Sequence, residues 1–184
     1  SELPVMVLGD CFLFPGCYLP LFIFEDRYRQ MLNHALKTDR MFCIGSRCGR
    51  ESNATDDVVQ VSCAGVVRAC VKQDDGTSHL MLMGVQRVRF TAWHEPKPYC
   101  MASIEPILSV RGSDAELIKL RDEALTLLPS CPNEASAVKA ALLEQIREQA
   151  DPELICDILT YNFVHRPSLL RASLAEAYVP RRYE

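Results

Sequence analysis

The apolar pattern of this sequence changes from a strand-like to a helix-like period near residue 113, and no other feature constrains its fold as strongly. Before that point, short apolar runs rich in valine alternate with turn residues such as Asp75-Gly76, whose glycine readily adopts the positive φ of a tight hairpin. After it, apolar residues recur at intervals of three or four. Strands followed by a separate set of helices are typical of an α+β protein and not of a parallel sheet with crossover helices. We therefore expect a mostly antiparallel sheet built from residues before about Ile107.

The strand half predicts a small, strongly curved sheet. Gly65 and Gly84 lie within apolar runs, where a glycine marks a bulge or a bend. Several short strands with such bends are typical of a barrel-like sheet. The expected strands cover residues 5–8, 12–14, 41–45, 58–71, 80–83, 85–93 and 99–107.

The helical half carries recognisable helix starts. Ser113 and Glu116 have the spacing of a capping box, in which each side chain accepts a free backbone amide of the first turn. Asp151-Pro152 pairs a capping side chain with a proline at the first helical position, and Arg166-Pro167 opens a further apolar run. We expect at least three helices after Ser113, one of them with an apolar face through residues 138–146.

The most concentrated apolar stretch, FPGCYLPLFIFEDRY, covers residues 14–28. Pro15 and Pro20 cannot donate hydrogen bonds to a sheet, so this stretch predicts an extended segment interrupted by turns. The apolar residues that follow recur at helical intervals and predict a helix from Glu25 to about Leu36.

The acidic residues at the start of that helix favour a structural interpretation. Negative charge is stabilised at a helix N-terminus, where backbone amides lack partners. We expect Glu25 to accept such amides or to pair with an arginine such as Arg27.

Composition narrows the function classes. A net charge of −4 without a basic tract makes nucleic acid an improbable partner. The nine cysteines are odd in number and contain no CxxC pair, so we expect reduced thiols that serve as small core residues, with no disulfide and no metal site. The N-terminal residues lack a basic leader, and the longest apolar run is broken by Pro20. These features predict a cytoplasmic protein that does not enter the membrane.

Several segments, taken in order, resemble the N-terminal domain family of Lon proteases. They are Phe14-Pro15-Gly16, the stretch Leu19-Pro20 to Glu25-Asp26-Arg27-Tyr28, the strand at 58–71, the Asp75-Gly76 hairpin, the run from Gly84 through Arg87 to Phe90, Pro98-Tyr99 with its following strand, and Asp151-Pro152-Glu153-Leu154 before a helix with Asp157. The residues expected to form the structural motif are Pro15, Gly16, Pro20, Glu25, Arg27, Tyr28, Gly76 and Gly84.

The resemblance implies a PUA-like curved antiparallel β pseudobarrel with one early helix over residues 1–110, followed by a helical bundle over 111–184, together forming one Lon N-terminal-type domain. It also implies a role in recognising unfolded polypeptide and a protease or chaperone as the partner. No phosphate-binding loop of the G-x4-G-K-[ST] type is present, which suggests a stand-alone domain without the ATPase and protease modules. We expect no enzymatic activity, no catalytic residue and no cofactor.

The expected binding surface is apolar. Leu80-Met81-Leu82-Met83 alternates, so leucines that fill a barrel turn Met81 and Met83 outward or against the helical tail. Methionine suits adaptable apolar binding. The residues predicted to bind polypeptide are Tyr18, Phe22, Met81, Met83 and Trp93. Two alternatives remain open: the methionines and Trp93 are covered within the fold, or the domain binds RNA as other PUA-like folds do.

Overall fold

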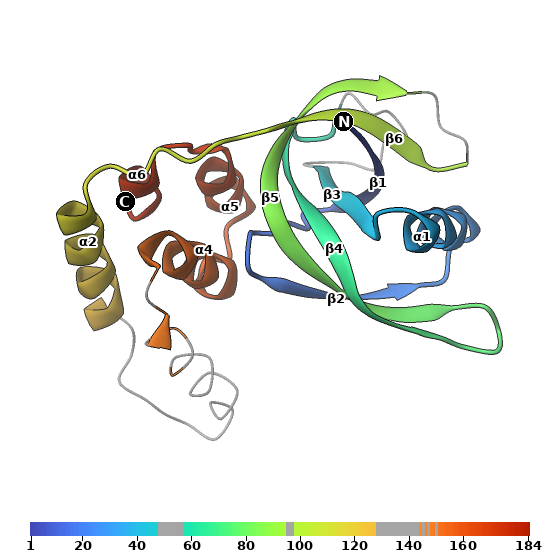
Figure 1. Ribbon diagram of the computed structural model, residues 1–184, viewed down its shortest axis with the longest axis horizontal. Helices are drawn as coiled ribbons and strands as arrows, with labels where there is room; N and C mark the ends of the chain where they lie inside the picture. The colour runs from blue at the N-terminus through green and yellow to red at the C-terminus, as the bar shows by residue number, and fades with distance from the viewer. Residues whose placement is uncertain (48–56, 95–97, 128–143, 145, 147, 150) are drawn as a thin grey trace.

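The computed structural model describes residues 1–47, 57–94, 98–127, 144, 146, 148, 149 and 151–184, which form a β lobe and a helical lobe (Figure 1). A strap at residues 107–112 runs between the lobes. The division at residues 110 and 111 stays a prediction from the sequence. The elements are β1 (Glu2–Gly9), β2 (Tyr18–Ile23), α1 (Asp26–Lys37), β3 (Met41–Arg47), β4 (Val61–Lys72), β5 (Ser78–His94), β6 (Cys100–Pro106), α2 (Asp114–Leu127), α4 (Pro152–Phe163), α5 (Pro167–Ala175) and α6 (Val179–Arg182).

The six strands form one mixed sheet in the order β2-β5-β4-β3-β1-β6, with an additional pairing of β5 to β6. Among the pairs of named strands, only β1 and β3 pair in parallel, and the other five pairs are antiparallel. The long β5 pairs with β2, β4 and β6, and β6 in turn pairs with β1. The sheet therefore curls back on itself without forming a regular barrel. Irregularities at Ala64/Gly65, Val67/Ala69 and Phe90/Ala92 bend the strands, as bulges do. The predicted α+β class and curved, mostly antiparallel sheet are confirmed.

Two strand predictions were wrong in detail. Residues 12–14 are not a strand: Phe12, Leu13 and Phe14 form a buried irregular segment before Pro15. The runs at 80–83 and 85–93 form the single strand β5, because Gly84 keeps an extended backbone while the neighbouring loop approaches it closely.

Two apolar clusters stabilise the β lobe. The larger contains Phe14, Phe42 and Leu82 and extends to Leu174 of α5, so the helical lobe packs on the same core. The smaller lies around Val5 and Ala102 at the other end of the sheet. The sheet and the C-terminal helices therefore share one continuous interior at their junction.

The helix starts follow the predicted signals. Ser113 Oγ accepts the Glu116 N–H at 3.2 Å, which is one of the two hydrogen bonds of a capping box. The Glu116 carboxylate accepts the Tyr178 hydroxyl instead of the Ser113 N–H, so the second bond is not formed. Asp151 accepts the Glu153 N–H at 3.2 Å, with Pro152 at the first helical position. The helix expected through residues 138–146 lies almost entirely outside the described residues. In the described ranges, no helix is long and apolar enough to cross a membrane.

Candidate functional site

Strand β2 presents one apolar row to solvent. It lies at the end of the sheet order, and its side chains alternate along the strand. Ile23 is buried, whereas Tyr18 and Phe22 are 53% and 48% exposed and Pro20 between them is also exposed. Pro20 lacks an N–H, and the Tyr18 carbonyl accepts the Tyr161 hydroxyl at 3.2 Å, so two positions of this edge are unavailable to an added strand.

The neighbouring strand β5 continues this row. Leu80 and Leu82 are buried, whereas Met81 and Met83 are half-buried on the opposite face. In the pairing register, Met83 lies opposite Tyr18 and Met81 lies opposite Pro20. The alternation that turned the methionines away from the core therefore places them beside the β2 row.

A stack of exposed rings completes the surface near the β4–β5 hairpin. The Phe22 ring lies 4.6 Å from the His79 ring and 5.8 Å from the Phe24 ring, measured between centroids. Phe24 is 60% exposed, and Val71, opposite His79 on β4, is 61% exposed. A hollow of about 400 Å³ lies beside the stack and is lined by Pro20, Leu21, Phe22, Ala69, His79, Leu80 and Met81. We call this surface the outer face. It consists of Tyr18, Pro20, Phe22, Phe24, Val71, His79, Met81 and Met83.

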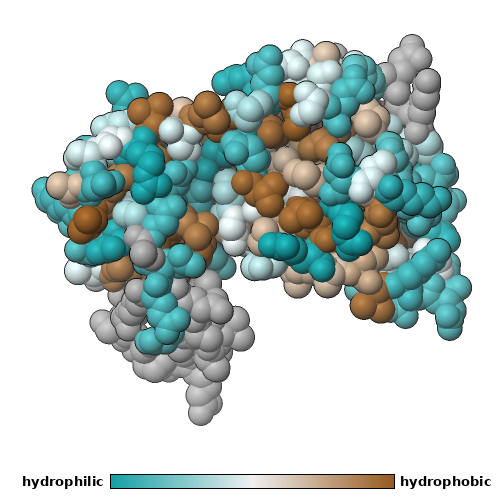
Figure 2. Space-filling model, in the orientation of Figure 1, coloured by the Kyte–Doolittle hydropathy of each residue, from teal (hydrophilic) through white to brown (hydrophobic). Residues whose placement is uncertain are grey.

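Trp93 does not join the outer face. It pairs with Ala102 near the far end of β5, ten residues beyond Met83, or about 33 Å of extended strand. Its ring packs 4.8 Å from the Phe90 ring and against the smaller apolar cluster. Figure 2 shows one side of the molecule, on which apolar side chains gather over the β lobe between hydrophilic groups.

The segment before β2 is held by its contact with Gly84. The Gly84 N–H donates to the Cys17 carbonyl at 2.9 Å, and the Gly16 N–H donates to the Gly84 carbonyl at 2.8 Å. Gly16 has a φ of +74°, and its Cα lies against Leu154 of α4. These contacts position Tyr18 at the junction of the lobes.

The charged residues at the start of α1 make local contacts. Glu25 is the residue before α1, and its carbonyl accepts the N–H groups of Tyr28 and Arg29. Its carboxylate accepts a hydrogen bond from Arg27 Nε at 2.8 Å and caps no amide. The Tyr28 hydroxyl donates to the Val7 carbonyl at 2.8 Å. At the hairpin, Gly76 has a φ of +84° and packs on Arg29.

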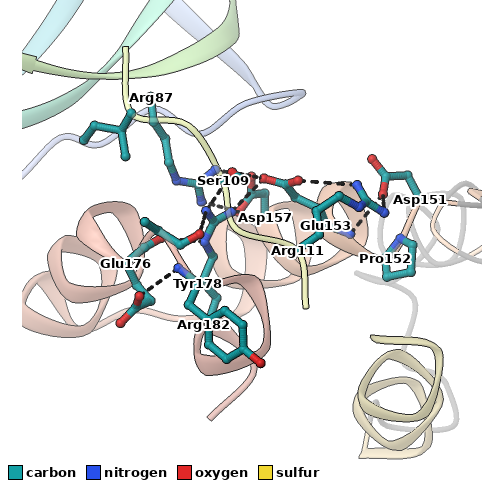
Figure 3. A network of polar contacts seen from close by, with 12 residues as sticks. Arg87, Ser109, Arg111, Asp151, Pro152, Glu153, Asp157, Glu176, Tyr178 and Arg182 are labelled. Carbon is teal, nitrogen blue, oxygen red and sulfur yellow. Dashed lines mark hydrogen bonds and ion pairs between the residues drawn. The ribbon is translucent and has the colours of Figure 1, made fainter. Parts of the chain in front are cut away.

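A buried polar network joins the two lobes (Figure 3). Arg87 of β5 makes a bidentate ion pair with Asp157 of α4, with Nη1 2.7 Å from Oδ2, and both side chains are at least 98% buried. Arg182 of α6 donates to Glu153 at 2.9 Å and to Ser109 of the strap at 2.9 Å. In the sequence, Arg87 and Asp157 belong to separate motifs, and neither motif predicts that the two residues pair. The local signal at each position is weak: Arg87 precedes Val88, and Asp157 lies between Cys156 and Ile158, so each is a charged residue beside apolar ones.

The ionisation of the central pair follows from its surroundings. Burial alone would lower the pKa of Arg87, but the hydrogen bonds and charge of Asp157 outweigh it and raise that pKa. Burial raises the pKa of Asp157, and the guanidinium groups of Arg87 and Arg182 oppose the rise. The network therefore contains a permanently charged Arg87 whose charge is balanced mainly by the carboxylate of Asp157, with a smaller contribution from Glu153.

The described cysteines are free thiols, and Cys48 and Cys131 lie outside the described residues. Burial raises the pKa of Cys63 and Cys156 to about 12, and it raises those of Cys17 and Cys43 further. Since the thiolate is the reactive form, these four thiols are unreactive at neutral pH. In the described part of the chain, no group of three or more metal-ligating side chains occurs.

This predicts a labelling pattern. In the folded protein at pH 8, iodoacetamide should leave Cys17, Cys43, Cys63 and Cys156 unmodified, because these thiols are both buried and protonated. All four should react after unfolding in urea. Peptide mass mapping of the two samples measures this, and rapid native labelling of any of the four would contradict the described packing.

A family model described as the substrate-binding domain of the ATP-dependent protease La (LON) matches residues 2–184. The chain belongs to this family. Among curated relatives, Lon protease 2 of Herpetosiphon aurantiacus is 28% identical over 178 residues, with 92% of this chain and 22% of that protein covered. Lon protease of Dictyoglomus thermophilum is 22% identical over 169 residues, with 87% of this chain and 20% of that protein covered. This Lon-type chain thus spans about a fifth of the length of these relatives.

Solved structures agree on the fold. The N-terminal domain of Mycobacterium avium complex Lon protease matches with a TM-score of 0.73 at 15% identity, covering 100% of this chain and 94% of that one. A Lon N-terminal domain protein from Xanthomonas campestris matches with a TM-score of 0.67 at 16% identity, and the match covers 99% of this chain and 94% of that one. The predicted family and architecture are therefore confirmed.

Proposed function

We propose that this domain binds extended, apolar polypeptide segments on its outer face and carries out no chemistry of its own. The observation that carries the proposal is the row of exposed Tyr18, Phe22, Phe24 and Val71, with Met81 and Met83 half-exposed between them. Scattered exposed apolar residues are ordinary, but a contiguous group is typical of an interaction surface. Membership in a substrate-binding domain family supports a recognition role.

The geometry of the outer face suits an extended chain. Outward side chains on β2 repeat every second residue, about 6.6 Å apart, which matches the side-chain repeat of an extended ligand. Apolar anchors supply binding, while ordering costs limit it, so we expect micromolar affinity or weaker, about −8 kcal/mol or less favourable. Methionine next to aromatic rings adapts to different side chains and favours low sequence specificity.

RNA is the competing ligand, because the exposed rings of Phe22, Phe24 and His79 resemble a stacking platform for bases. The net charge of −4 argues against it. Binding to RNA should weaken steeply with salt, whereas apolar peptide binding should change little.

The test is a titration with a permanently unfolded protein and with single-stranded RNA, at salt concentrations roughly tenfold apart. Phe22→Asp should weaken polypeptide binding about tenfold or more, because it removes a central aromatic anchor. Leu169→Asp is the matched control, since Leu169 is 51% exposed on α5 outside the outer face. Equal losses from both variants, or salt-sensitive RNA binding without polypeptide binding, would refute the proposal.

A further inference from the structure

The β4–β5 ladder contains a bulge beside the hollow of the outer face. Val67 pairs with Leu82 and Ala69 pairs with Met81, so Arg68 has no partner of its own. In such a bulge two residues oppose one, and the extra residue is turned away from the regular alternation. Arg68 and Ala69 are both exposed, in contrast to the buried Val67. The bulge therefore places an arginine on the side of the sheet that carries Met81.

Arg68 lies next to the hollow. Ala69, its neighbour about 3.3 Å further along the strand, lines the hollow together with Phe22 and Met81. Arg68 does not itself line the hollow, but an arginine side chain is longer than this spacing, so its guanidinium can extend to the rim.

The charge of Arg68 is uncompensated within the described residues. Arg27 pairs with Glu25 and Arg29 pairs with Asp26, but no acidic side chain in the described ranges pairs with Arg68. An exposed guanidinium presents a planar fork of donors that matches a carboxylate. A cation at the edge of an apolar hollow is complementary to a segment with an acidic residue next to an apolar one.

We propose that Arg68 is a specificity-determining residue, which makes the outer face select extended segments with a carboxylate beside an apolar anchor. This inference rests on the proposed function, because it names which polypeptide segments the same surface prefers. The apolar side chain of the ligand enters the hollow beside Phe22 and Met81, and its neighbouring Asp or Glu pairs with Arg68.

The test uses three synthetic peptides that share alternating leucine and phenylalanine residues and differ at one position, which is Glu, Gln or Lys. The wild-type protein should bind the Glu peptide about two- to fivefold more tightly than the Gln peptide, which is the range of an exposed ion pair. The preference should shrink with added salt. Arg68→Gln should abolish it, and Arg68→Glu should reverse it in favour of the Lys peptide.

Lys72→Gln is the matched control, because Lys72 is an exposed cation on the same strand, four residues from Arg68. It should keep the preference for the Glu peptide. Equal binding of the Glu and Gln peptides by the wild type, or a preference that survives Arg68→Gln, overturns the inference. If all three peptides bind equally but Phe22→Asp still weakens them, only the role of Arg68 fails. If no peptide binds, the proposed function fails with it.

Discussion

Asp157→Ala should destabilise the protein by about 3–5 kcal/mol. The substitution removes the carboxylate that balances Arg87, whose side chain is only 2% exposed and lies between the two lobes. The guanidinium cannot lose its charge, so it stays buried without a partner or the lobes separate to hydrate it. Urea unfolding followed by far-UV circular dichroism measures the change in the free energy of unfolding.

The matched control is Glu25→Ala, which breaks an ion pair of similar length at the surface. The side chains of Arg27 and Glu25 are 51% and 39% exposed, so the loss should stay below about 1 kcal/mol. A double variant, Arg87→Met with Asp157→Leu, should be more stable than Asp157→Ala, because it removes the buried charge of Arg87 together with that of its partner. Equal effects of Asp157→Ala and Glu25→Ala would show that the pair is not buried as described.

The sequence predicted most elements of this fold because most of them leave a local pattern. The Asp75-Gly76 hairpin, the Asp151 cap and the turn of Leu80 and Leu82 into the core all depend on neighbouring residues. Local sequence patterns predict where a single helix, strand or turn lies and which side chains of a strand are buried.

Contacts between distant segments were not predictable from the same patterns. Arg87 and Asp157 are 70 residues apart, and nothing in either segment specifies the other. The bulge at Arg68 depends on the register of two strands, and the sequence shows only an arginine in a valine-rich run. Trp93 joined the predicted binding residues because it ends an apolar run before Pro96, but its distance from Met83 depends on the two predicted strands forming the single long strand β5.

Gly84→Ala should cost about 3 kcal/mol or more, at the upper end of what inserting one methyl group into a packed interior costs. A Cβ at this position would lie 2.1 Å from the Phe14 carbonyl oxygen and 2.7 Å from its carbonyl carbon. Both atoms belong to the backbone, so no side-chain rotation relieves the overlap, and the segment before β2 must move. Such a shift breaks the hydrogen bonds from the Gly84 N–H to Cys17 and from the Gly16 N–H to Gly84.

Gly9→Ala is the control, because a Cβ at Gly9 meets no atom within 4 Å, and its effect should stay within about 0.5 kcal/mol. Amide hydrogen exchange distinguishes a local shift from general loosening. In Gly84→Ala the Gly16 amide should lose protection, whereas the Val5 and Cys43 amides of the β1–β3 pair should keep theirs. Because the same segment positions Tyr18 opposite Met83, polypeptide binding should weaken in Gly84→Ala even where the variant remains folded. Unchanged stability and unchanged Gly16 protection would contradict the close approach of this segment to β5, and with it the way the outer face is held.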